Sequence, residues 1–213
     1  MQNLVKENIK GILQEITLVM NEEKTYLTEL DAAMGDGDLG LTMCTGFQTL
    51  TNEIDNINTD DIGLLLMKLG MCMNSVVPST MGTLISTCFI KSGKSVKGKV
   101  TLTLEDFVKM GDAAVNGVIE IGNTKLGEKT MLDALHPAVI SLKESYSENK
   151  SLVEAAALAY KAASLRVEET KNMKSVHGRA AYYGEKSLGR PDSGATAVMF
   201  IFKAINQYAE NFR

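Results

Sequence analysis

The sequence predicts an all-α fold, an antiparallel barrel or bundle of eight helices. Apolar residues recur three or four positions apart, which is helical spacing, along most of the 213 residues. No stretch sustains the two-residue alternation of a half-buried strand, and capping residues precede several periodic segments. Hydrophobic residues make up 45% of the chain and charged residues 23%, so a single domain over residues 1–213 can bury a substantial core.

Eight segments carry this helical periodicity, and local signals mark where several of them begin. Ser79 or Thr80 can cap one helix, and residues 103–106 and 151–154 resemble capping boxes. Residues 91–100 are rich in lysine and glycine and are expected to form a solvated basic loop. The expected helices cover residues 5–29, 41–54, 62–69, 84–90, 107–121, 130–135, 152–170 and 195–208.

Four breaks between these segments are rich in Gly, Ser, Thr or Asp: residues 35–42, 75–83, 122–130 and 178–194. The last of them is the least regular stretch of the chain. In an up-and-down array of helices, alternate connections lie at the same end. Helix N-termini gathered at one end leave backbone N–H groups free, so this end is expected to bind an anion.

Residues 30–42, which include the first break, hold three carboxylates and three glycines. Asp36 and Asp38 are two positions apart and point the same way in an extended loop, while Asp31 ends the preceding helical pattern. Carboxylates this close repel one another unless a cation neutralises them. We therefore predict a magnesium site formed by these three side chains. The alternative is an acidic turn whose aspartates cap the next helix.

Three familiar motifs are excluded. Residues 35–40 match G-x-G-x-x-G, but a helical pattern rather than a strand precedes them. Counted from Asp36 as an EF-hand loop, the twelfth position is Phe47, where a bidentate Glu is required. Residues 93–100 approach a P-loop, but Val100 stands where a hydroxyl must reach magnesium.

The composition limits the classes of binding partner and the cellular compartment that the sequence supports. The net charge is −4, which offers no general basic field for nucleic acid or a membrane surface. Three widely spaced cysteines fit buried thiols in a reducing cytoplasm better than a disulfide framework. No signal peptide and no membrane-spanning run is expected.

Three blocks of the sequence, in this order, carry a resemblance to a known family: residues 30–40 (LDAAMGDGDLG), 127–138 (GEKTMLDALHPA) and 178–196 (GRAAYYGEKSLGRPDSGAT). They resemble the L subunit of dihydroxyacetone kinase, the nucleotide-binding subunit, and the similarity extends over essentially the whole chain. The resemblance implies a barrel of eight antiparallel helices that binds ADP and two magnesium ions at one end.

Carried over by position, the resemblance assigns Asp31, Asp36 and Asp38 to the magnesium ions and leaves the catalytic residue unassigned. Simpler roles stand beside three of the other assignments: Thr130 can cap its helix, Met131 can belong to the core, and Arg179 can pair with Glu185. The implied nucleotide contacts are Leu39, Gly40, Leu41, Thr42, Ser79, Thr80, Met81, Gly82, Gly122, Thr130, Met131, Gly178, Arg179, Pro191, Asp192 and Ser193.

The function implied by the resemblance is phosphoryl transfer in glycerol metabolism, in the cytoplasm. A separate K subunit would hold the acceptor dihydroxyacetone, and a phosphocarrier M subunit fed from phosphoenolpyruvate would recharge the bound ADP. A transcription regulator is a further partner to be considered. Neither His136 nor His177 needs to be phosphorylated in this scheme.

Two departures from the family pattern leave alternatives open. Leu39 stands where the family usually has His, and residues 78–83 (PSTMGT) replace the usual Gly-Gly-Ala-Ser-Gly-Pro. Pro78 removes a backbone donor, and Thr80 and Met81 crowd a place where small residues approach phosphate. The chain could therefore be a divergent paralogue, a nucleotide-binding regulatory or interaction subunit with little activity, or an ATP-dependent kinase subunit for another acceptor.

Overall fold

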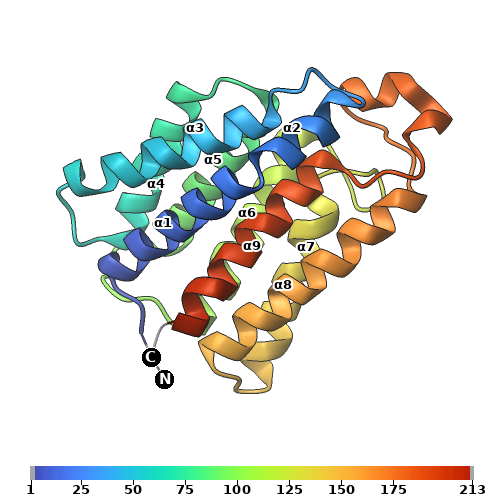
Figure 1. Cartoon of the computed structure of the whole chain (residues 1–213). Helices are drawn as coiled ribbons and strands as arrows, with labels where there is room; N and C mark the ends of the chain where they lie inside the picture. The colour runs from blue at the N-terminus through green and yellow to red at the C-terminus, as the bar shows by residue number, and fades with distance from the viewer. Residues whose placement is uncertain (1–2, 212–213) are drawn as a thin grey trace.

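A computed structural model describes residues 3–211, which form nine α-helices and three short 3-10 segments (Figure 1). These described residues contain no strand, and Leu4 and Leu102 form an isolated antiparallel bridge. The all-α prediction is confirmed. The elements are α1 (Lys6–Glu22), α2 (Lys24–Ala32), α3 (Leu39–Glu53), η1 (Ile54–Asn56), α4 (Ile62–Val76), α5 (Thr80–Ser95), α6 (Leu104–Gly122), α7 (Leu132–Ser147), α8 (Leu152–Glu169), η2 (Thr170–Asn172), η3 (Arg179–Ser187) and α9 (Ser193–Asn211).

The helices form a closed ring. Each helix from α3 to α8 packs against the helix that follows it in the chain. Helix α1 closes the ring by packing against both α3 and α9 (Figure 1). Helix α2 follows α1 after a break at Glu23, so the pair acts as one interrupted helix in an eight-helix antiparallel barrel. Because direction alternates around the ring, α3, α5, α7 and α9 all begin at the same end.

The barrel is held together by a continuous apolar core. Phe47, Leu50, Leu65 and Leu69 are fully buried at its centre, and apolar side chains from α1 and α5 to α9 join the same cluster. Helices α4 and α5 approach closely because glycine faces glycine: a Cβ on Gly63 would lie 2.5 Å from the Gly93 carbonyl oxygen. Burial on this scale, at roughly 25 cal/mol per Å² of apolar surface, is the main stabilising contribution.

The predicted caps are confirmed. Ser79 caps α5 by accepting from the N–H of Gly82 at 3.0 Å. Residues 103–106 and 151–154 form capping boxes at the starts of α6 and α8. Each cap satisfies N–H groups that a helix leaves unpaired at its first turn, and each is typically worth about 1 kcal/mol.

Several predicted boundaries are wrong. The first helix is interrupted at Glu23, whose dihedral angles (φ −93°, ψ 5°) are not helical. The expected basic loop over residues 91–100 is helical as far as Ser95, because Ser92 and Gly93 pack inward while lysines occupy the exposed side. Helix α7 begins at Leu132 rather than at Thr130 and continues to Ser147. The stretch 178–194 contains the 3-10 segment η3 and the first turn of α9.

Two further sequence expectations can be compared with the described residues. All three cysteines are free thiols, with Cys44 buried and Cys72 and Cys88 partly buried. None of the helices within residues 3–211 has the length and apolar character needed to cross a membrane.

Candidate functional site

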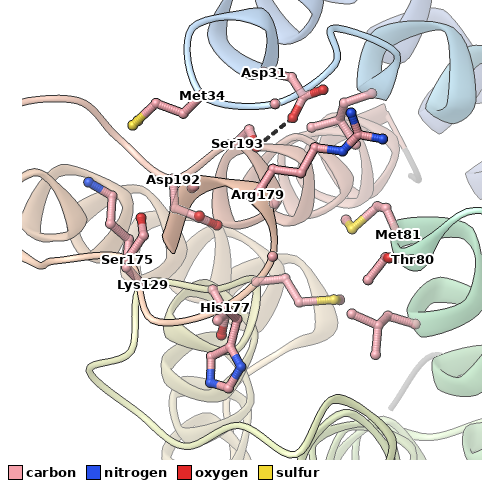
Figure 2. A pocket seen from close by; sticks show the side chains of 18 of the residues that line it. Asp31, Met34, Thr80, Met81, Lys129, Ser175, His177, Arg179, Asp192 and Ser193 are labelled. Atoms are coloured by element: carbon pink, nitrogen blue, oxygen red, sulfur yellow. Dashed lines mark hydrogen bonds between the residues drawn. The ribbon is translucent and has the colours of Figure 1, made fainter. Parts of the chain in front are cut away.

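A cavity of about 560 Å³ opens at the end of the barrel where α3, α5, α7 and α9 begin (Figure 2). All four predicted breaks contribute to its wall, as the alternation of helix direction requires. Most of the predicted site residues line it: Asp31, Asp36, Asp38, Leu39, Ser79, Thr80, Met81, Gly122, Thr130, Met131, Gly178, Arg179, Pro191, Asp192 and Ser193.

Three carboxylates form an acidic cluster on one wall of this cavity. One oxygen from each of Asp31, Asp36 and Asp38 lies within 4.8 Å of the others. Asp31 is held in place by the N–H of Gly37, which donates to its Oδ2 at 3.0 Å, and by the Ser193 hydroxyl at 3.3 Å from its Oδ1. Gly37 has φ +73°, so the turn that presents this N–H favours glycine. Hard oxygen ligands at this spacing suit a magnesium ion.

The acidic cluster carries an electrostatic cost. Burial, followed by the charges of Asp36 and Asp31, raises the pKa of Asp38 above its ordinary value. The Arg179 guanidinium offsets part of this repulsion, because its Nη2 lies 2.7 Å from Asp36 Oδ2. Arg179 therefore pairs across the mouth of the cavity and not with Glu185, which binds Lys174 instead. A bound cation would neutralise the same cluster more completely.

Helix N-termini surround this acidic wall. Leu39, Thr80 and Ser193 are the first residues of α3, α5 and α9, and all three line the cavity. The first N–H groups of a helix have no partner within the helix, and the helix dipole adds partial positive charge there. The arrangement suits a polyanion whose charge is shared between a cation and the backbone.

The remaining wall of the cavity is largely apolar. Leu84 of α5, Val118 of α6 and Met131 before α7 line it together with Met81. Thr130 both lines the cavity and helps to cap α7, since its Oγ1 accepts from the N–H of Leu132 at 3.3 Å. Met131 likewise belongs to the core, with 3% exposure, and to the cavity wall. An apolar wall beside an anion site suits an aromatic base joined to phosphates.

The segment 173–192, which carries Arg179, crosses the cavity and is fixed by two adjacent residues of the loop before α7. Glu128 Oε2 lies 2.6 Å from His177 Nε2 on one leg of the segment. Lys129, which is 2% exposed, donates from Nζ to the carbonyls of Ser187 and Arg190 on the other leg. Together these contacts hold Arg179 over the mouth.

Asp192 lies at the base of this segment and precedes α9. Its Oδ2 accepts from the N–H of Ala195 at 2.7 Å, which caps the helix. Burial raises the pKa of Asp192 to about 7, while the nearby Lys129 ammonium acts in the opposite direction. Burial also lowers the pKa of Lys129. In both groups desolvation outweighs the mutual attraction, so each is pushed toward its neutral form.

The raised pKa of Asp192 predicts a pH dependence of stability. The folded state retains the Asp192 proton up to about pH 7, while the unfolded chain releases it near its ordinary value of 3.8. The contribution of this group to the free energy of unfolding therefore falls as pH rises from about 4 to 7. Asp192→Asn keeps an acceptor for Ala195 but does not ionise, so its stability relative to wild type should increase over that window. Urea titrations at several pH values test this, and parallel curves for the two chains would contradict it.

Four predicted nucleotide contacts do not line the cavity. Gly40 packs against α2, where a Cβ would overlap the Lys24 carbonyl oxygen, and Gly82 packs in the same way against the Val77 carbonyl. Leu41 is 56% exposed and Thr42 is buried within α3. Gly40 and Gly82 therefore let neighbouring backbones approach, and any contact with a ligand from 40–42 would come from backbone N–H groups.

Other residues of the cavity were not predicted from the sequence. They include Met34, Leu84, Val118, Thr124, Lys129, Ser175 and His177. Lys129 lies inside the second block of resemblance, next to Glu128. A lysine within a glycine-containing break is a signal that could have identified it. Ser175 and His177 had no such signal, because they follow a helix end without any recognisable spacing.

Comparisons with known proteins agree with this geometry. A model of the DAK2 domain matches residues 33–207. The "PEP-dependent dihydroxyacetone kinase, ADP-binding subunit DhaL" of Escherichia coli (strain K12) is 37% identical over 187 residues, which are 88% of this chain and 89% of that protein. The corresponding subunit of dihydroxyacetone kinase 1 from Listeria innocua is 33% identical over 188 residues, which are 88% of this chain and 89% of that protein.

A solved structure shows the same fold. The dihydroxyacetone kinase of C. freundii, crystallised in complex with AMP-PNP and Mg²⁺, superposes with a TM-score of 0.73 and 25% sequence identity. The match covers 97% of this chain and 34% of that one. With the DAK2 match over most of the sequence, these findings confirm the resemblance to the L subunit of dihydroxyacetone kinase. The chain belongs to the DAK2 domain family.

Proposed function

We propose that this chain is the ADP-binding subunit of a phosphoenolpyruvate-dependent dihydroxyacetone kinase. The observation that carries the proposal is the acidic cluster of Asp31, Asp36 and Asp38 among three helix N-termini in one cavity. Relatives at 37% and 33% identity are named as ADP-binding subunits of such kinases. A related kinase has been crystallised with AMP-PNP and Mg²⁺, which supports magnesium and a nucleotide as the ligands.

In this proposal the residues of the cavity divide into three functions. Asp31, Asp36 and Asp38 would hold two magnesium ions, which would supply positive charge beside the terminal phosphoryl group. Backbone N–H groups at the starts of α3, α5 and α9 face the phosphates, and the apolar wall around Met131 and Leu84 receives the base. Arg179, which pairs with Asp36 at 2.7 Å, would be available to the phosphates if bound cations neutralised that carboxylate.

The acceptor and the donor lie outside this domain. We place dihydroxyacetone on a separate K subunit, because the relatives matched over 89% of their own length are named as ADP-binding subunits. A phosphocarrier M subunit, fed from phosphoenolpyruvate, recharges ADP in place. Residues 1–213 then act as a single nucleotide-binding domain, and the free thiols fit a reducing cytoplasm.

A reconstitution assay tests the proposed function. The purified chain, a K subunit and dihydroxyacetone are combined with Mg²⁺ and either ATP or a phosphoenolpyruvate-driven phosphocarrier system. With the phosphocarrier system, we expect dihydroxyacetone phosphate to form when ADP is present only in catalytic amounts. Turnover with free ATP alone would instead favour an ATP-dependent kinase, and a different phosphorylated acceptor would overturn the assignment of dihydroxyacetone.

A second candidate function is a nucleotide-binding regulatory or interaction subunit. The cavity wall favours it at one place, where Pro78 in the loop before α5 and Met81 in the first turn of α5 line the cavity. Pro78 offers no N–H, and Met81 presents a thioether where a phosphate would need a donor. Magnesium-dependent nucleotide binding without phosphoryl transfer from any donor would support this candidate.

A further inference from the structure

We propose that Ser175 and Asp192 bind a sugar hydroxyl of the nucleotide and so distinguish ribose from deoxyribose. This inference rests on the proposed nucleotide-binding function and names a specificity determinant of the same cavity. Figure 2 shows Ser175 and Asp192 on one side of the cavity, with Met81 and Thr80 across from them.

The Ser175 hydroxyl is a buried polar group that still needs a partner. Ser175 is 4% exposed and lines the cavity, and its Oγ has no hydrogen bond to any described residue. Its backbone N–H is already used, donating to Ser187 Oγ at 3.0 Å. A buried hydroxyl without a partner is costly, and a ligand in the cavity can remove that cost.

The other hydroxyls of the cavity are already hydrogen-bonded, apart from that of Thr80, which is an exposed residue on the opposite side (Figure 2). Ser79 caps α5, Ser193 contacts Asp31, and Thr124 and Thr130 lie 3.4 Å apart at their Oγ1 atoms. Ser175 is therefore the hydroxyl of this wall that is left for a ligand, among the residues that the structure describes.

The neighbouring Asp192 defines the chemistry of the group that fits. One of its oxygens is taken by the N–H of Ala195, and the carboxyl group lines the cavity. A carboxyl oxygen accepts from a hydroxyl whether or not the group is ionised. A serine hydroxyl that can donate or accept, on the same side of the cavity as this carboxyl acceptor, matches an alcohol group of a sugar (Figure 2).

The position of this corner also fits a sugar. Asp192 immediately precedes Ser193, whose hydroxyl lies 3.3 Å from Asp31 Oδ1 in the acidic cluster. The sugar is the group that follows the phosphates along a nucleotide, so it lies one step away from the cations. The base then reaches the apolar wall of Leu84 and Val118.

Isothermal titration calorimetry with Mg²⁺ tests the inference by comparing ADP, 2′-deoxy-ADP and 3′-deoxy-ADP on wild type and Ser175→Ala. We expect wild type to bind ADP about fivefold more tightly than at least one deoxy analogue, the typical size of one neutral hydrogen bond. In Ser175→Ala that preference should fall to less than twofold. The variant keeps its Cβ and loses no internal hydrogen bond, so it should fold normally.

Ser145→Ala is the matched control. Ser145 is 1% exposed and its Oγ also lacks a partner, but it does not line the cavity. This variant should keep the wild-type preference for ADP.

The inference is overturned if Ser175→Ala keeps the full preference for ADP, or if wild type binds both deoxy analogues as tightly as ADP. Failure of every nucleotide to bind wild type would refute the proposed function itself, which is a distinguishable outcome.

Discussion

Asp38→Asn is expected to weaken magnesium-dependent binding of ADP about 100-fold, close to 3 kcal/mol. The substitution removes one of the three carboxylates whose oxygens lie within 4.8 Å of one another. The set of ligands around a bound divalent cation would lose one unit of negative charge, while the shape of the loop is kept. Asp38 is preferred to Asp31 for this experiment because its side chain makes no capping hydrogen bond to α3, whereas Asp31 accepts from Gly37.

The same variant, although it weakens binding, should slightly stabilise the folded chain in the absence of ligand. Burial and the charges of Asp36 and Asp31 disfavour the ionised form of Asp38, so its neutralisation should raise the melting temperature slightly in the absence of magnesium. Asp60→Asn, an exposed carboxylate between η1 and α4, is the control and should change neither quantity. If Asp38→Asn bound ADP as wild type does, these aspartates would not hold the metal.

The sequence supports the all-α barrel because its evidence is local and repeated. Helical periodicity, caps such as Ser79 and the capping box at Ser151 each specify a helix independently of the others. The alternation of direction then places alternate connections together without any knowledge of side-chain contacts. The cavity at one end of the barrel was therefore predictable from the positions of four breaks.

Contacts between distant residues were not predictable in the same way. Arg179 was free to pair with the nearby Glu185, yet it reaches Asp36, more than a hundred residues away. The side chain of Lys129 similarly crosses to the carbonyls of Ser187 and Arg190. Such pairings depend on which loops the closed ring brings together, and no sequence spacing reports them.

The glycines of the site show the same limit in another form. The resemblance assigns Gly40 and Gly82 to the nucleotide, and that assignment stays a prediction. In the structure both glycines also permit close packing, Gly40 against α2 and Gly82 against the Val77 carbonyl. The sequence does not distinguish a glycine that packs against protein from one that approaches a ligand.

Gly40→Ala provides a prediction in which two physical effects have opposite signs. Alanine is favoured over glycine within a helix by about 1 kcal/mol, so propensity alone predicts a more stable chain. The added Cβ, however, would overlap the Lys24 carbonyl oxygen and the Thr28 hydroxyl. Thr28 can rotate, but Lys24 cannot move without shifting α2, which the buried Leu27 anchors. We expect packing to prevail, with a net loss of about 2 kcal/mol and a fall of roughly 4–8 °C in melting temperature.

The displacement should also reach the metal ligands, because α2 carries Asp31 and α3 begins directly after Asp38. Separating the two helices moves these carboxylates apart, so the affinity for Mg-ADP should fall together with the stability. Thr45→Ala, on the exposed side of α3, changes propensity without a clash and should stabilise the chain by a few tenths of a kcal/mol. If Gly40→Ala were as stable as wild type or more stable, the tight contact between α2 and α3 would not be what positions the acidic cluster.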